Sequence, residues 1–467
     1  MVKKLVIMLV AFIPLLLIGC SAKDNCNELK FSIDWKYNEL IHYQVLLNED
    51  GTEDESVIKE ASAHQYGASS ILDDYYVWTC GVCGYEKKEL MSEHEHIYAY
   101  AWDYDENGHY HQATCHDEKS DEEEHDLSEW ETVVSATVYK EGEESRCCKV
   151  CGYSETRETK RIDVNRINML KKGDTVALLC PASATSASNV TAAVNKIKAY
   201  GLNVKTYASA TSGSSYSVSY LALSDETRAK EINECFADPE IKGIICMRGG
   251  YGSSRTLDLL DYDVIKANPK FFVGYSDITA LINAFYFKCG FISYQGFMGV
   301  TLTSSNLDAI TKADIESVLF EYQEGHTYNY GKYISKSNET VEGTLIGGNL
   351  SLFVHLLGSE YLPDCKDKIV FLEDTGEATY SLDRMFTKLR LFHVFDDAKA
   401  IVIGYLTNSS EKAQIEAMVK RIFGDLDIPV LYGFPSGHEF PIISLPIGAK
   451  VEVSPNGLKI LDEVYNK

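Results

Sequence analysis

The chain has 467 residues, of which 45% are hydrophobic and 24% are charged. This balance is ordinary for globular protein, and it excludes wholesale disorder and a multi-span membrane protein. Asp and Glu total 69 against 44 Lys and Arg, which gives a net charge of −25. That balance argues against DNA or RNA as the main partner, because phosphate contacts need a basic face. The length predicts two to four domains.

Residues 1–20 have the pattern of an export signal. An early pair of lysines precedes an apolar run over 5–18, which is short for a membrane span. The segment ends in Leu-Ile-Gly-Cys, which resembles a bacterial lipobox. We therefore expect Cys20 to carry a lipid that anchors the mature protein at the extracytoplasmic face of the cell membrane. The alternative is an ordinary secretory signal with an incidental cysteine.

Residues 21–165 form an acidic region rich in Cys and His. The region carries 34 acidic and 13 basic side chains, a net charge of −21. The motif C-x-x-C-G-Y occurs twice, at 80–85 and at 148–153. Two cysteines at this spacing present two thiolates to one metal ion, and the glycine permits the tight turn. The repetition predicts two copies of one small module.

Histidines interleaved with these cysteines favour zinc, although an exported protein also permits disulfides. Residues 60–160 are similar to zinc-ribbon-like repeats of surface proteins in Gram-positive anaerobes. Val138 stands where such repeats often have cysteine, which predicts an incomplete last metal site. The candidate zinc ligands are His64, Cys80, Cys83, His94, His96, His111, Cys115, His125, Cys148 and Cys151.

Beyond residue 165 apolar strands alternate with helices. The predicted strands cover 172–180, 202–207 and 241–247, and the predicted helices cover 190–200 and 224–235. Ser224 has the position of an N-cap of the second helix. This alternation is typical of an α/β protein with a parallel sheet.

Two loops that follow predicted strands have residues suited to acyl chemistry. The sequence Arg-Gly-Gly-Tyr-Gly-Ser at 248–253 leaves backbone N–H groups open, so we expect it to hold a carboxylate or an oxyanion. It lacks the Gly-Lys-Ser/Thr of a P-loop and the third glycine of a dinucleotide fingerprint. Ser276, between a strand and a helix, has the position of a nucleophile on a strained elbow. A helix N-cap explains the same position equally well.

Five motifs in order carry a resemblance to one family. They are Arg-Gly-Gly-Tyr-Gly-Ser at 248–253, Val-Gly-Tyr-Ser-Asp-Ile-Thr at 273–279, Leu-Ile-Gly-Gly-Asn-Leu at 345–350, Phe-Leu-Glu-Asp at 371–374 and Pro-Ser-Gly-His at 435–438. On these motifs residues 168–467 resemble the LD-carboxypeptidases, which include muramoyltetrapeptide carboxypeptidases and microcin C immunity proteins. The resemblance implies a two-lobed α/β fold, with a nucleophile lobe over 166–325 and a strand-rich lobe over 335–467.

The resemblance also implies a catalytic triad of Ser276, Glu373 and His438 between the lobes, with no cofactor for catalysis. In such a triad the base takes the serine proton and the carboxylate steadies the imidazolium. From the residues alone, Asp374 and Glu377 are alternative candidates for the role of the acid. The histidines that compete with the base are His326, His355 and His393.

The family's oxyanion hole maps onto the backbone N–H groups of Gly250 and Asp277, with Gly249 as an alternative to Gly250. Arg248, Tyr251 and Asn349 are candidates for holding substrate. For Asn349, which follows two glycines, capping of the next helix is the alternative.

We therefore expect a surface-anchored serine carboxypeptidase that cleaves the L,D-bond to a terminal D-alanine in peptidoglycan-derived peptides. One alternative is a microcin C-type immunity amidase, which the expected location outside the cytoplasm disfavours. Another is a non-catalytic cell-wall-binding lipoprotein, against which the retained triad residues argue. The expected partners are peptidoglycan peptides and, through the lipid anchor, the membrane, and a homodimer is one of the assemblies considered.

Overall fold

The computed structural model describes residues 32–466, except 49, 92, 94, 115–117, 322–323, 363 and 408–409. Cys20, His94 and Cys115 lie outside the described residues. The chain divides into two compact units, which we call the first unit (Met1–Glu129 and Cys147–Ser154) and the second unit (Trp130–Arg146 and Glu155–Lys467). Within the described ranges, no helix has both the length and the apolar character needed to cross a membrane.

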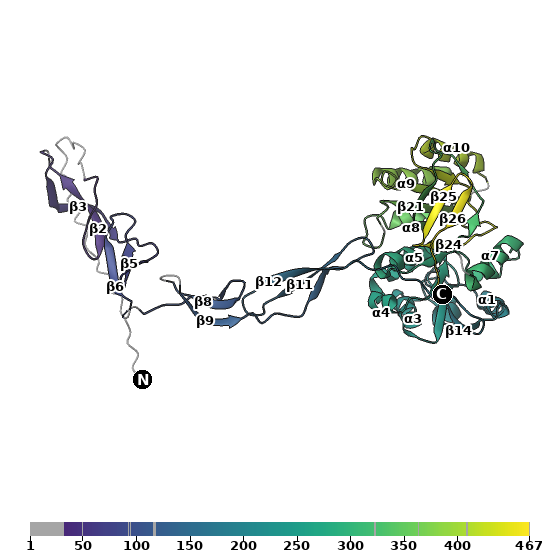
Figure 1. Cartoon of the computed structure of the whole chain (residues 1–467), viewed down its shortest axis with the longest axis horizontal. Helices are drawn as coiled ribbons and strands as arrows, with labels where there is room; N and C mark the ends of the chain where they lie inside the picture. Colours follow the sequence, from purple (N-terminus) through teal and green to yellow (C-terminus); the bar gives the residue numbers. More distant parts are fainter. Residues whose placement is uncertain are drawn as a thin grey trace. The chain divides into compact units, whose positions relative to one another are not determined.

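The first unit contains three small antiparallel sheets (Figure 1). Their strands are β1 (Lys36–Tyr37), β2 (Ile41–Leu47) and β3 (Glu53–Ala63), then β4 (Ser70–Leu72), β5 (Tyr75–Thr79) and β6 (Glu86–Leu90), then β7 (Asp103–Tyr104), β8 (Gly108–Gln112) and β9 (Lys119–Glu124).

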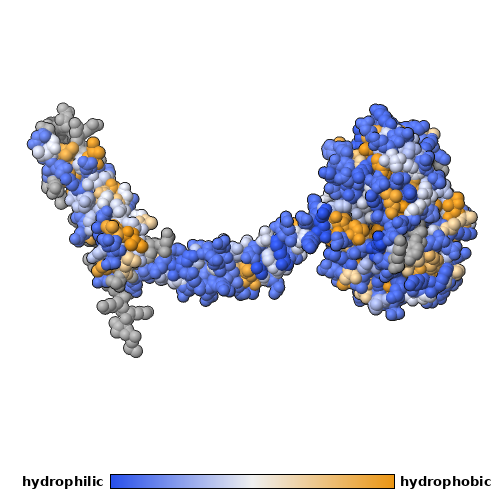
Figure 2. All heavy atoms as spheres, viewed as in Figure 1, coloured by the Kyte–Doolittle hydropathy of each residue, from blue (hydrophilic) through white to orange (hydrophobic). Residues whose placement is uncertain are grey.

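These sheets have little apolar core. Among the described residues of the first unit, the buried hydrophobic side chains are Val45, Tyr76, Val77, Trp78, Cys80, Ala113 and Cys148. The stretch that carries β8 and β9 is almost entirely hydrophilic on the face shown in Figure 2. Sheets of this size need another source of stability, such as a bound metal.

The end of the predicted Cys/His-rich region packs on the second unit. Its last sheet consists of β10 (Glu131–Val134), β11 (Gly142–Cys147) and β12 (Ser154–Thr159). The Tyr139 ring lies 5.7 Å from the ring of Phe287, and the N–H of Val138 donates to the carbonyl of Phe287 at 3.2 Å. The ammonium of Lys368 lies 4.3 Å from the centre of the Tyr139 ring. These contacts explain why most of 130–165 belongs with the second unit.

The nucleophile lobe is built on a six-stranded sheet in the order β14-β13-β15-β16-β17-β24. The strands are β13 (Thr175–Leu179), β14 (Asn203–Thr206), β15 (Ile241–Cys246), β16 (Phe271–Gly274), β17 (Ser293–Gln295) and β24 (Leu445–Ile447). All neighbours are parallel except β24, which is antiparallel to β17. The predicted parallel sheet is confirmed.

The helices of this lobe follow the predicted alternation with the strands. They are α1 (Ala187–Ala199), α2 (Ala208–Ser212), α3 (Asp225–Ala237), α4 (Tyr262–Ala267), α5 (Thr279–Ala284), α6 (Gly299–Leu302) and α7 (Ala309–Phe320). The Ser224 hydroxyl accepts from the N–H of Thr227 at 3.3 Å, so the predicted N-cap of α3 is confirmed.

The second lobe is built on an eight-stranded mixed sheet in the order β18-β26-β25-β20-β21-β22-β23-β19. Its strands are β18 (Thr327–Tyr328), β19 (Lys332–Tyr333), β20 (Val341–Asn349), β21 (Lys368–Thr375), β22 (Ala400–Thr407), β23 (Val430–Tyr432), β25 (Lys450–Ser454) and β26 (Gly457–Ile460). Its helices are α8 (Leu350–His355), α9 (Thr379–Leu391) and α10 (Lys412–Phe423). Because β24 leaves this lobe to join the first sheet, the lobes are not wholly consecutive in sequence.

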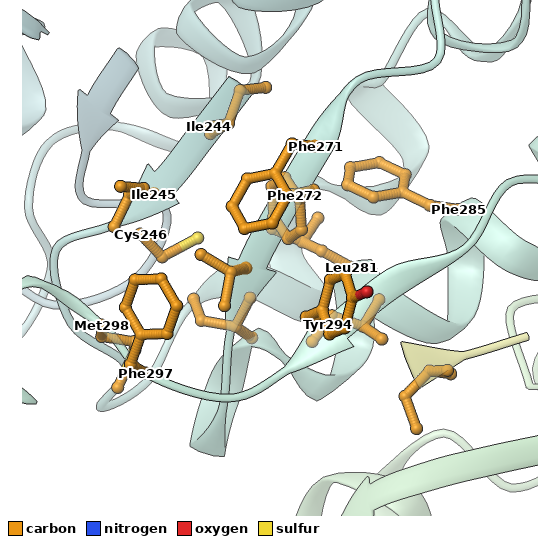
Figure 3. Close-up of a cluster of buried hydrophobic side chains, with 14 of the residues drawn as sticks. Ile244, Ile245, Cys246, Phe271, Phe272, Leu281, Phe285, Tyr294, Phe297 and Met298 are labelled. Carbon is orange, nitrogen blue, oxygen red and sulfur yellow. The ribbon is translucent and has the colours of Figure 1, made fainter. Parts of the chain in front are cut away.

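The core of the nucleophile lobe surrounds β15 and β16 (Figure 3). The rings of Phe272 and Phe285 meet edge to face at 4.9 Å, and Phe236 meets Phe285 at 5.3 Å. All three rings are fully buried. This packing holds β16, and so the turn that follows it, against the segment that continues α5.

We expect Phe285→Ala to lower the free energy of unfolding of the second unit by about 3–5 kcal/mol, because it leaves a cavity among these rings. Phe392→Ala is the matched control, since Phe392 is 53% exposed, and it should change this energy by no more than about 0.5 kcal/mol. Denaturant titration followed by helical circular dichroism measures both, because every described α-helix lies in the second unit. Equal, small losses for the two variants would contradict the packing.

Candidate active site and metal-binding residues

Ser276 lies at the sharp turn between β16 and the helical segment that begins there. Its φ is +64°, in the left-handed region that a non-glycine residue occupies at a cost of about 1–3 kcal/mol. Ser276 is the first residue of the 3-10 helix Ser276–Ile278, whose N-cap position is Tyr275, and the N-cap residues of this helix and of α5 make no side-chain capping hydrogen bond. Gly274 is needed because an added Cβ would lie 2.8 Å from Cγ2 of Ile278. The strained turn favours the nucleophile elbow over the N-cap.

Glu373 and His438, the predicted acid and base, form a hydrogen-bonded pair beside this turn. Glu373 lies within β21 and is fully buried, and its Oε2 lies 2.8 Å from Nδ1 of His438. The loop between β23 and β24 comes this close to the carboxylate because position 437 is glycine. A Cβ at that position would lie only 2.7 Å from Glu373 Oε2. The His438 ring meets the ring of Tyr275, the residue before Ser276, at 4.9 Å. With Nδ1 engaged, Nε2 is the nitrogen available to a serine.

The environment of His438 favours its charged form. Burial lowers the pKa of His438, but the charge of Glu373 and its hydrogen bond outweigh burial, so the pKa lies above the ordinary value of 6.5. Asp374 adds a smaller contribution in the same direction. The imidazole of His438 is therefore suited to take and hold a proton, as the predicted base must.

Asn349 and Asp374 support the acid. The side-chain amide of Asn349 donates to Asp374 Oδ1 at 3.2 Å and lies 3.4 Å from Glu373 Oε1. Its Oδ1 accepts from the N–H of Leu352 at 3.2 Å, so Asn349 caps α8, which was the alternative to substrate binding. Asp374, the rival acid, is instead bonded to the hydroxyl of Ser351 at 2.7 Å.

The glycine-rich loop after β15 packs against the elbow. A Cβ on Gly249 would lie 2.9 Å from Cβ of Ser276 and 3.1 Å from the backbone N of Asp277. Gly250 has a φ of +106°, and its N–H donates to no described residue. The buried carboxylate of Asp277 ties elbow to loop by accepting from the N–H of Ser253 at 2.7 Å. The N–H groups of Gly250 and Asp277 therefore lie on segments that flank the serine, as an oxyanion hole requires.

The remaining candidates lie around this loop or away from it. Arg248 donates to the carbonyl of Ala184 at 3.0 Å, and Tyr251 is 42% exposed beside it. Of the rival bases, His326 stacks on Tyr328, and His393 is exposed and bound to Asp396.

The first unit brings two groups of four potential metal ligands together. One group is His42, His64, Cys80 and Cys83, and the other is His109, His125, Cys148 and Cys151, with the ligand atoms of each group within 4.8 Å of one another. The four cysteines of these groups are free thiols. Burial raises the pKa of Cys80, but backbone N–H groups of the knuckle and His64 outweigh it and lower the pKa to about 5. The groups can therefore hold a metal.

Six of the ten predicted ligands lie in these two groups, and His42 and His109 were missed. A shared sequence signal was available, because each follows a tryptophan by seven residues, Trp35 and Trp102. The last group has four potential ligands, so the incomplete site predicted from Val138 is not observed.

Two further predicted ligands lie in neither group. His96 is paired with Glu118 at 2.8 Å, and His111 stacks on Trp102 with ring centres 4.0 Å apart. His94 and Cys115 are outside the described residues.

Comparison with known proteins identifies the second unit. Residues 176–296 match the model of the LD-carboxypeptidase N-terminal domain, and residues 342–453 match that of the C-terminal domain. The chain is 32% identical over 295 residues to a probable murein peptide carboxypeptidase of Bacillus subtilis, covering 61% of this chain and 90% of that protein. It is 33% identical over 258 residues to the microcin C7 self-immunity protein MccF of Escherichia coli, covering 48% of this chain and 75% of that protein.

Solved structures agree with the sequence relatives. The muramoyltetrapeptide carboxypeptidase of Oxalobacter formigenes aligns with a TM-score of 0.55 and 28% identity, covering 63% of this chain and all of that one. Wild-type MccF aligns with a TM-score of 0.56 and 26% identity, covering 65% of this chain and all of that one. The elbow serine, the buried Glu–His pair and these matches together show that the chain belongs to the LD-carboxypeptidase family of serine peptidases.

Proposed function

We propose that this serine carboxypeptidase removes the terminal D-alanine from peptidoglycan-derived tetrapeptides by cutting an L,D-bond. The observation that carries the proposal is the buried Glu373–His438 pair beside a serine held at positive φ. Relatives named murein peptide and murein tetrapeptide carboxypeptidases, from Bacillus subtilis and Pseudomonas aeruginosa, support this substrate class.

The proposed reaction has two steps. Ser276 Oγ attacks the carbonyl carbon of the scissile bond while His438 Nε2 takes the hydroxyl proton. The developing oxyanion accepts hydrogen bonds from the N–H groups of Gly250 and Asp277. His438 then gives its proton to the leaving amine of D-alanine. Water, activated by the same histidine, hydrolyses the acyl-serine and restores the enzyme.

The second candidate is cleavage of a microcin-type peptide conjugate, which the 33% identity to a microcin self-immunity protein favours. The same triad would serve it, so substrate rather than mechanism separates the two proposals. We favour the peptidoglycan peptide because the sequence of residues 1–20 is typical of an exported lipoprotein.

We also propose that Cys20 is lipidated and holds the enzyme at the extracytoplasmic face of the membrane, where peptidoglycan peptides are found. The Cys/His groups of the first unit are proposed to hold structural zinc. The ligand atoms come from buried or half-buried side chains, as in a closed structural site. Catalysis by the family's triad uses no cofactor, so this metal would stabilise the first unit only.

The substrate proposal predicts that the purified protein removes one alanine from a tetrapeptide muropeptide, as mass spectrometry of the products would detect. Ser276→Ala should lower kcat by about 10³-fold or more, because only the nucleophilic oxygen is removed. Ser188→Ala, an exposed serine in the first turn of α1, is the control and should keep full activity. Cleavage of a microcin-type conjugate with no cleavage of the muropeptide would favour the second candidate.

A second prediction concerns pH. Glu373→Gln removes the charge that holds the pKa of His438 above 6.5, so that pKa should fall. The acidic limb of kcat/KM, where His438 becomes protonated, should then move to lower pH, while kcat falls by about 10²–10⁴-fold. Glu377→Gln serves as control, and a pH profile shifted by that variant instead would show that the wrong acid has been assigned.

The anchor proposal predicts that cells fed a labelled fatty acid incorporate the label into the protein, and that Cys20→Ala abolishes incorporation. Cys26→Ala, a nearby cysteine outside the lipobox, should retain the label. Undiminished labelling of the Cys20→Ala protein would refute lipidation at this position.

A further inference from the structure

The two Cys/His groups take their ligands from equivalent positions in a repeated arrangement of strands. The first histidine lies on the middle strand of a sheet, His42 on β2 and His109 on β8. The second histidine, His64 or His125, follows the last strand of the same sheet directly. The two cysteines come from the C-x-x-C knuckle that joins the last two strands of a later sheet. Each group therefore joins a sheet to a C-x-x-C knuckle that follows it in the sequence.

The distances between ligand atoms fit one tetrahedral metal in each group. In the first group Cys83 Sγ lies 3.3 Å from His64 Nδ1, and Cys80 Sγ lies 3.7 Å from His42 Nδ1. The equivalent contacts in the second group are 3.5 Å and 3.8 Å. Zinc bonds of about 2.3 Å to sulfur and about 2.0–2.1 Å to nitrogen in a tetrahedron place these atoms about 3.6 Å apart.

The second histidine of each group is fixed in the same way. His64 Nε2 lies 2.7 Å from the carbonyl of Asn38, and His125 Nε2 lies 2.8 Å from the carbonyl of Asp105. This bond places the ring proton on Nε2 and leaves Nδ1 free for a metal. The tyrosine of each C-x-x-C-G-Y motif stacks on that ring, with Tyr85 on His64 at 4.6 Å and Tyr153 on His125 at 4.2 Å.

The first histidine of each group also has an equivalent neighbour. Trp35 meets His42 edge to face at 4.8 Å, and Trp102 meets His109 in the same way at 4.6 Å. Both histidines are 1% exposed. The two groups thus have the same kinds of ligand and the same kinds of aromatic ring around them. In each group a backbone carbonyl orients one of the histidines.

The residues around His96 and Ala113 occupy the equivalent position between the two Cys/His groups, and they differ from both. Residues two positions after His64 and His125 form isolated β-bridges with Cys80 and Cys148, and the residue two positions after His96 forms the equivalent bridge with Ala113. Alanine therefore stands where the other junctions have their first cysteine. The Tyr76 ring meets His96 at 6.0 Å, and His96 pairs with Glu118 at 2.8 Å.

We propose that the protein binds two zinc ions, one in each His2Cys2 group, because among the described residues the junction around His96 and Ala113 lacks the cysteine that the other two junctions share. This inference rests on the proposed presence of structural zinc and adds the number of ions, their ligands and their equivalence. Because the described sheets of the first unit bury few apolar side chains, the binding energy of both ions contributes to their folding.

Metal analysis of the reduced full-length protein tests the inference, with a readout independent of hydrolysis. We expect two zinc ions per chain, one in His42→Ala, one in His109→Ala and none in the double variant. His96→Ala and His111→Ala are the matched controls and should keep two ions. Cobalt substitution should give the absorption of tetrahedral S2N2 sites.

Tryptophan fluorescence reports on folding near the metal, because the four tryptophans lie at positions 35, 78, 102 and 130. A chelator should change this fluorescence while the helical circular dichroism of the second unit stays constant. His42→Cys, which replaces one ligand by another, should restore two ions and separates loss of a ligand from misfolding.

The outcomes distinguish this inference from the general zinc proposal. A metal-free reduced protein would overturn both. Three ions per chain, loss of an ion in His96→Ala, or two ions retained in His42→Ala would overturn the two-site assignment alone.

Discussion

The active site depends on one buried interaction, the 2.8 Å contact between the carboxylate of Glu373 and Nδ1 of His438. A fully buried carboxylate is costly unless it is paired and hydrogen-bonded, and here its partners come from β20 and from the loop after β23. Asn349, opposite Glu373 in the parallel pairing of β20 and β21, supplies the second contact. Gly437 lets the histidine loop approach. The same contact raises the pKa of His438. One interaction therefore both pairs the buried carboxylate and prepares the histidine for its predicted role as base.

The sequence predicted the parts of the fold and the site that local patterns specify. Apolar strands alternating with helices indicated the parallel sheet, and the turn at Ser276 indicated the elbow. The histidine and the acid came from the family resemblance, since Asp374 and Glu377 competed with Glu373 on local grounds. The antiparallel β24 could not be predicted, because a three-residue strand carries no pattern that identifies its distant partner β17. Likewise, only the structure shows that Asn349 combines capping of α8 with support of the acid.

The first unit shows the same division between local and distant signals. Each C-x-x-C-G-Y knuckle is visible in the sequence because its ligands lie within six residues. His42 and His109 are separated from their cysteines by 38 and 39 residues and lie on strands of other sheets, so no local spacing links them to those cysteines, and only their shared distance from a tryptophan sets them apart. The place of His96 among other histidines predicts a ligand, but in the structure His96 pairs with the carboxylate of Glu118. Which residues can bind the metal therefore depends on which side chains the fold brings together, and not on the local sequence alone.

We predict that Ser276 forms the covalent intermediate of the reaction and that its acid and base come from the other lobe. The most direct test of this prediction is trapping with a phosphonate analogue of a D-alanine-terminated peptide, followed by intact mass measurement and peptide mapping. We expect one adduct per chain, on the peptide that contains Ser276, formed more slowly when His438 is protonated or replaced. An adduct on a different side chain, or labelling at the same rate in Ser276→Ala, would contradict it.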